Sequence, residues 1–138
     1  MTERSRHWMA VPLPAGQPAP VGSYSRVVRA GDFLYISGQV PRDAVTGALQ
    51  GDDVAGQTRA VLANVGRVLG HAGATLSDLV AVTAYLERIE DWDAFDAVYR
   101  EHFTSPYPSR TTLGAGLHGV LVEISGVAYL PVGGPGAG

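Results

Sequence analysis

Only two segments of the chain carry the apolar spacing of an amphipathic helix, whereas six short segments are typical of β-strands. One helix is predicted from an N-cap at Asp52 or Asp53 to about His71, and the other from an N-cap at Asp91 to about Phe103. The strands are expected over 8–11, 24–29, 33–37, 79–86, 109–115 and 120–129. This order predicts an α+β fold, a mixed β-sheet with two helices packed on one face. Because two helices leave the second face of such a sheet uncovered, self-association is also expected.

Length and charge limit the class of protein. The 138 residues, 46% of them hydrophobic, suffice for one domain, expected over residues 1–132, and the glycine-rich tail over 133–138 is expected to be disordered. The net charge of −3 argues against a nucleic-acid partner. No apolar run is long enough for a membrane span and the N-terminus lacks the apolar core of a signal peptide, so a cytoplasmic location is expected.

Two residue types are absent from the sequence, and their absence narrows the available chemistry. There is no cysteine, and all ten basic residues other than histidine are arginine. Thiolate nucleophiles, Schiff-base lysines and the common cysteine-based zinc sites are therefore excluded. The four histidines are not spaced for chelation, so no metal is expected, and only His118 is kept as a minor candidate.

The stretch from Pro108 to Glu123 holds the strongest candidate site. Strands over 109–115 and 120–129 around the turn 116–119 predict a hairpin in which Thr112 faces Glu123. Arg110 would then share one face with Glu123, and the two are expected to form an ion pair. Spacing alone supports a structural ion pair and a site for a small anionic substrate attacked by water about equally.

A series of motifs in this order resembles the Rid family, the YjgF/RidA-type reactive-intermediate deaminases. The resemblance runs from about Pro20 to Tyr129. Its motifs are Gly22–Ser25, Tyr35–Pro41, Gln57–Asn64, Ala72–Ala74, Asp91–Tyr99, Pro108–Thr112 and Val122–Ile124.

The resemblance implies a chorismate-mutase-like fold, assembled as a homotrimer with sites between subunits. It implies hydrolysis of enamines and imines such as 2-aminoacrylate to 2-keto acids and ammonia, without a cofactor. By position, Arg110 matches the arginine that holds the substrate carboxylate, and Glu123 matches the glutamate that directs the attacking water. Tyr24 matches a tyrosine lining the site, and the backbone near Gly38 and Thr112 completes the substrate-binding contacts.

The chain departs from the family pattern at three places. Ser23 stands where a proline is usual, Asp96 stands where an asparagine is usual, and the turn at 116–119 is two residues shorter. Two alternatives stay open beside a deaminase of 2-aminoacrylate-type imines. One is a non-catalytic ligand-binding or regulatory trimer. The other is a pathway-specific deaminase of a different imine or of an aminated ring-cleavage product. Ribonuclease activity is disfavoured by the acidic balance.

Overall fold

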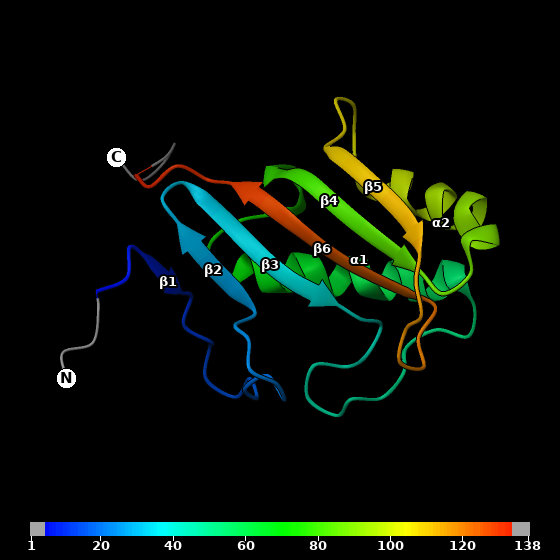
Figure 1. The fold of residues 1–138 in the computed structure, drawn as a ribbon, viewed down its shortest axis with the longest axis horizontal. Coiled ribbons are helices and arrows are strands. Elements are labelled where there is room, and N and C mark those ends of the chain that lie inside the picture. The colour runs from blue at the N-terminus through cyan, green and yellow to red at the C-terminus, as the bar shows by residue number, and fades with distance from the viewer. Residues whose placement is uncertain (1–4, 134–138) are drawn as a thin grey trace.

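The computed structural model describes residues 5–133, which form a six-stranded sheet and two α-helices (Figure 1). The strands are β1 (Trp8–Ala10), β2 (Val27–Ala30), β3 (Phe33–Gln39), β4 (Leu79–Leu86), β5 (Ser109–Gly114) and β6 (Val122–Tyr129). The helices are α1 (Val54–Gly70) and α2 (Trp92–Tyr99). The predicted element order and α+β class are confirmed. The tail expected to be disordered lies, except for Gly133, outside the described residues.

The ends of α1 follow local chemistry. The Asp53 carboxylate accepts a hydrogen bond from the Gly56 N–H at 2.8 Å, which satisfies one of the free donors of the first turn. The helix ends at Gly70, as the spacing predicted. Helix α2 follows Asp91, but the Asp91 side chain makes no capping bond, and the helix is shorter than expected.

The sheet has the strand order β1-β2-β3-β6-β4-β5. Every pairing is antiparallel except that of β4 with β5, which is parallel because α2 connects them. The sheet is thus mixed, with β3 and β6 at its centre and both helices behind it in Figure 1.

The predicted hairpin between β5 and β6 is wrong, because β4 lies between them. The connection from β5 to β6 instead passes around the end of β4. There the Ala115 N–H donates to the carbonyl of Leu86, and the Glu87 N–H donates to the carbonyl of Leu121. Residues 116–119 therefore bridge two strands that are not neighbours. The two residues that the chain lacks at 116–119, relative to the family pattern, are therefore missing from this connection and not from a hairpin turn.

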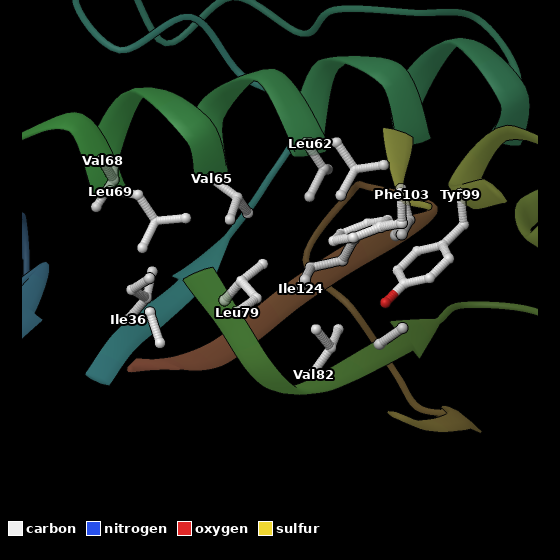
Figure 2. Packing of buried hydrophobic residues seen from close by; sticks show 14 of the residues in the cluster. Ile36, Leu62, Val65, Val68, Leu69, Leu79, Val82, Tyr99, Phe103 and Ile124 are labelled. Carbon is white, nitrogen blue, oxygen red and sulfur yellow. The ribbon is translucent and has the colours of Figure 1, made fainter. Parts of the chain in front are cut away.

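The core lies between α1 and the sheet (Figure 2). One stripe of α1, which includes Leu62, Val65 and Leu69, is at most 1% exposed. It packs against apolar residues of the strands, among them Ile36 and Ile124 (Figure 2). Burying each side chain of this size stabilises the fold by about 1.5 to 3 kcal/mol, so the stripe fixes α1 on this face.

Two polar side chains of α1 fasten the loops at the edge of the core. The buried Gln57 side chain donates to the Gly51 carbonyl at 3.2 Å and accepts from the Leu121 N–H at 2.8 Å. The Asn64 amide donates to the Val40 and Arg42 carbonyls at 2.8 and 2.9 Å. These bonds position the segment after β3 and the start of β6, which both line the candidate site.

The second face of the sheet carries large exposed side chains. Phe33, Tyr35 and Tyr129 are 40%, 48% and 44% exposed, and Phe33 packs edge-on against Tyr129. Phe33 and Tyr35 alternate with Leu34 and Ile36, which are buried beneath α1, so the aromatic rings point away from the helices. Within residues 5–133, no helix is long and apolar enough to cross a membrane.

Candidate active site

Arg110 lies on the helix-covered face of β5. Its guanidinium donates to the Asp96 carboxylate of α2 at 2.8 Å, and the two side chains are 16% and 20% exposed. It also lies over the rings of Trp92, Phe95 and Tyr99, at 5.3, 5.2 and 4.4 Å from their centroids. The aromatic face of α2 and one carboxylate thus hold the guanidinium in place.

Asp96 is shared by two arginines. Arg100 approaches the second carboxylate oxygen of Asp96 at 2.9 Å, one helical turn away on α2. Burial raises the pKa of Asp96, but the hydrogen bonds and charges of Arg110 and Arg100 outweigh it, so the pKa lies below its usual value. Asp96 is therefore ionised at neutral pH and neutralises much of the Arg110 charge.

A cavity of about 480 Å³ opens beside this pair, and we call it the arginine half-site. It is lined by Asp96, Tyr99, Arg100, Tyr107, Pro108 and Arg110. The Tyr99 hydroxyl is buried without a hydrogen-bond partner among the described residues. The same holds for Oγ1 of Thr112, which lies on the same face two residues beyond Arg110. Such groups usually have a partner, so a ligand or a second chain is a natural source for one.

Glu123 lies on the opposite face of the sheet. Its neighbours Val122 and Ile124 are buried in the core, so alternation directs Glu123 away from the helices. The carboxylate sits directly over Gly38 of β3, where an added Cβ would lie 2.3 Å from Oε2. Glycine at this position is therefore what allows the carboxylate to occupy its place.

A second cavity, of about 530 Å³, surrounds Glu123, and we call it the glutamate half-site. It is lined by Val21, Tyr24, Ser37, Gly38, Val40, Arg42, His118, Val120 and Glu123. The structure thus gathers Tyr24, Gly38 and Glu123, three of the residues singled out in the sequence, and adds the minor candidate His118. Tyr24 is 52% exposed, so its ring forms the open rim of this cavity.

The predicted ion pair between Arg110 and Glu123 is wrong within one chain. Arg110 is the register partner of Val82 on β4, and Glu123 is the partner of Tyr85. Val82 and Tyr85 are three residues apart, so the two side chains point to opposite faces. Side-chain alternation would place Arg110 and Glu123 on one face only if β5 and β6 were paired, and β4 lies between them. The partner of Arg110 is Asp96.

The sequence carries a signal for the position of Asp96 on the aromatic side of α2. Trp92, Asp96 and Tyr99 fall at i, i+4 and i+7 of the predicted helix, so they share one stripe with the aromatic residues. An acid on an otherwise apolar stripe predicts a buried cation. Nothing in the sequence, however, specified that α2 packs behind β5.

The side chains that line the two half-sites suit chemistry with water. Among residues 5–133, no three histidine, aspartate or glutamate side chains lie close enough together to hold a metal ion. The groups that line the two half-sites are a guanidinium, carboxylates, tyrosine hydroxyls and one imidazole. These groups can hold an anion, orient water and move a proton.

The model of the family described as endoribonuclease L-PSP matches residues 15–130. The chain belongs to this family. It is the Rid family that the sequence motifs resemble. A RutC family protein of Pyrococcus horikoshii is 40% identical over 114 residues, which are 81% of this chain and 90% of that protein. A Dermatophagoides farinae protein named 2-iminobutanoate/2-iminopropanoate deaminase is 32% identical over 70% of this chain and 76% of its own.

Solved structures share the fold. RidA from an Antarctic Psychrobacter species superposes with a TM-score of 0.80 at 28% identity, covering 88% of this chain and 100% of that protein. Membership in the Rid family supports deaminase chemistry at the family level. The separation of Arg110 from Glu123 is a property of the single chain that any assignment of a site must explain.

Proposed function

We propose that the chain is an enamine/imine deaminase that hydrolyses 2-aminoacrylate-type imines to 2-keto acids and ammonia. The observation that carries this proposal is the division of the site. In the arginine half-site the Asp96 carboxylate is already bound by Arg110 and Arg100, and in the glutamate half-site the Arg42 guanidinium already donates to the Gly47 carbonyl. Two copies of the chain supply both Arg110 and Glu123 when the arginine half-site of one meets the glutamate half-site of another. The assembly is a homotrimer with three such clefts.

The uncovered face of the sheet supports self-association. Its exposed aromatic residues Phe33, Tyr35 and Tyr129 form an apolar surface that water meets in the isolated chain. The glutamate half-site opens on this same side, because Glu123 points away from the helices. A copy that covers the aromatic surface therefore also reaches the glutamate cavity. The cytoplasmic location expected from the sequence stays a prediction.

The chemistry assigns one role to each half. Arg110 binds the substrate carboxylate, which fixes the imine carbon toward Glu123 of the neighbouring chain. An enamine first gains a proton at carbon and becomes the imine. Glu123 orients water and accepts its proton as the oxygen adds to the imine carbon. Glu123 then returns this proton to the carbinolamine nitrogen. The carbon–nitrogen bond breaks, the hydroxyl group gives its proton to the Glu123 carboxylate, and ammonia leaves as the keto group forms.

The binding contacts complete this arrangement. Tyr24 closes the rim of the glutamate half-site, and the backbone near Gly38 lies beside the Glu123 carboxylate. Thr112 offers a buried hydroxyl with no partner in the described chain on the arginine side. No step of this hydrolysis needs a cofactor, because the imine is already electrophilic and water is the second reactant.

The proposal is tested by keto-acid release. An amino-acid oxidase generates the imine, and the purified chain should accelerate formation of the keto acid. Arg110→Ala and Glu123→Gln should each reduce the acceleration by at least about a hundredfold, since each removes a charged contact to substrate or water. Arg59→Ala is the matched control, because it removes an exposed arginine that pairs with Glu101 and lines neither half-site. Equal rates for the wild type, Arg110→Ala and a blank without protein would overturn the proposal.

A second candidate is a ligand-binding or regulatory trimer without catalysis. The close Asp96–Arg110 pair favours it, because a substrate carboxylate has to share the guanidinium with an internal acid. Keto-acid binding without turnover across a broad panel of imines would select this candidate. Turnover of one imine alone would select the pathway-specific deaminase.

Ribonuclease activity, which the family description names, receives no support from the site. The chain carries a net charge of −3, and both half-sites expose a carboxylate as well as a cation. An assay with purified protein and RNA decides it: activity that remains in Arg110→Ala and disappears on further purification comes from a contaminant.

A further inference from the structure

Three arginines line a third cavity, of about 360 Å³, which we call the basic cavity. Arg26 precedes β2, Arg42 follows β3, and Arg67 lies in the last turn of α1. The loop at 18–21 and the turn at 43–47 form the other walls. The cavity thus combines guanidinium groups from three segments that are distant in sequence.

The basic cavity is short of negative charge. Its one acidic lining residue is Asp43, whose carboxylate already accepts hydrogen bonds from the Val45 and Thr46 N–H groups at 2.9 and 2.8 Å. Those bonds hold the turn together and lower the pKa of Asp43, so the carboxylate is charged but engaged. Three cations face one carboxylate.

One of the three guanidinium groups, that of Arg26, has a nitrogen without a hydrogen-bond partner among the described residues. Arg67 donates to the Gln17 side chain at 3.1 Å, and Arg42 donates to the Gly47 carbonyl at the same distance. Nη1 of Arg26 is buried and has no hydrogen-bond partner among the described residues. A buried charged donor without a partner is costly, which makes it a marker for an absent ligand.

Repulsion among the basic groups also indicates that the cavity would bind an anion. Burial, followed by the charge of Arg26, lowers the pKa of Arg67, and Asp43 offsets this only partly. Burial, followed by the charges of Arg67 and Arg26, lowers the pKa of His71 at the end of α1. An anion in the cavity would relieve this repulsion and pair with Arg26.

The basic cavity adjoins the glutamate half-site. Val21, Tyr24, Gly38, Val40 and Arg42 line both. An acidic group held by Arg26 and Arg67 can therefore belong to the same molecule whose reacting carbon lies beside Glu123.

We propose that the basic cavity binds a second acidic group of the substrate, so that the preferred imines and keto acids are dicarboxylates. This inference rests on the deaminase function proposed above. Arg110 of one chain holds the carboxylate next to the imine carbon, and Arg26 and Arg67 of the neighbouring chain hold the distal carboxylate.

Two measurements test the dicarboxylate preference. Rates are compared for oxidase-generated imines of aspartate and of alanine, and binding of 2-oxoglutarate is compared with that of 2-oxobutanoate by calorimetry. We expect the wild type to prefer the dicarboxylate by at least about tenfold in both, as one charged hydrogen bond can supply. Arg26→Gln and Arg67→Gln should each reduce this ratio toward one, whereas Arg59→Gln, on the exposed outer side of α1, should leave it unchanged.

The two proposals fail in different ways. A wild type that releases keto acids but shows no dicarboxylate preference, or a preference that persists in both variants, overturns the second acidic subsite and leaves the deaminase standing. If no imine is hydrolysed, the calorimetric ratio still decides whether the basic cavity selects dicarboxylates. Thermal unfolding identifies a variant that fails to fold, and the other variant then carries the comparison.

Discussion

At the scale of single residues, the site depends on contacts that one atom can change. Gly38 leaves room for the Glu123 carboxylate, and Asp96 sets how much of the Arg110 charge a ligand meets. Both act by positioning or neutralising the groups that would touch the substrate.

Gly38→Ala should displace Glu123. The new Cβ would lie 2.3 Å from Oε2, closer than any real contact, so the carboxylate has to move. We expect keto-acid release to fall by about tenfold or more, with little loss of stability. Gly66→Ala in α1 is the control, since its Cβ would meet the Leu76 side chain at an ordinary 3.8 Å. Full activity in Gly38→Ala would show that the position of this carboxylate does not matter.

Asp96→Asn should strengthen keto-acid binding. The amide leaves Arg110 in place but removes the internal charge that competes with the ligand carboxylate. A charge-assisted hydrogen bond contributes about 1.5 to 3 kcal/mol, so we expect roughly tenfold tighter binding by calorimetry. Weaker or unchanged binding would mean that the ligand carboxylate does not meet Arg110.

The same substitution predicts a pH dependence of stability. The pKa of Asp96 is lower in the folded chain than in the unfolded chain, so its contribution is present above the unfolded pKa and is lost as the pH falls through the folded pKa. The wild type should therefore be more stable than Asp96→Asn at pH 7, and the difference should shrink below about pH 4. Urea unfolding of both proteins at several pH values measures it. A constant difference would contradict this linkage.

At the scale of elements, α1 organises both the core and the loops. Its apolar stripe packs on the sheet, while Gln57 and Asn64 reach the segments that line the glutamate half-site. The helical spacing of the apolar residues explains the first role. The buried amides explain the second, because each satisfies backbone groups that no strand pairs.

Gln57→Leu should destabilise the fold. It leaves the partly buried Leu121 N–H without its partner and removes the bond to the carbonyl of exposed Gly51, at a cost of about 1 to 3 kcal/mol. Arg59→Ala two residues along α1 removes only an exposed ion pair with Glu101, so it should cost less than about 1 kcal/mol. Denaturant unfolding measures both, and equal costs would show that the amide bonds are not needed.

At the scale of the whole molecule, the position of β4 between β5 and β6 decides how the site is built. It sends Arg110 to the helix-covered face and Glu123 to the aromatic face. A complete set of groups therefore has to come from more than one chain under the proposed function.

Mixing two inactive variants tests whether one site combines residues of two chains. Arg110→Ala and Glu123→Gln chains, each inactive alone, should regain activity when unfolded together and refolded, because some clefts then combine an intact Arg110 with an intact Glu123. Light scattering should give a mass of three chains. A mixture as inactive as its components, despite exchange of subunits, would place both residues in one chain's site.

The sequence by itself determined the element order, because helical and strand periods are local. The ends of α1, the bounds of β4 and the buried stripe of α1 follow from caps and apolar spacing. Tyr24, Gly38 and Glu123 of the glutamate half-site were also named from the sequence, through the motifs that resemble the Rid family. Only the tertiary structure decided which strands are neighbours. Alternation along a strand tells which residues share a face, but it does not say which strand lies beside it. For that reason the sequence did not predict that Arg110 pairs with Asp96 of α2 instead of Glu123. The basic cavity had no local sequence pattern either, because its three arginines are far apart in the chain.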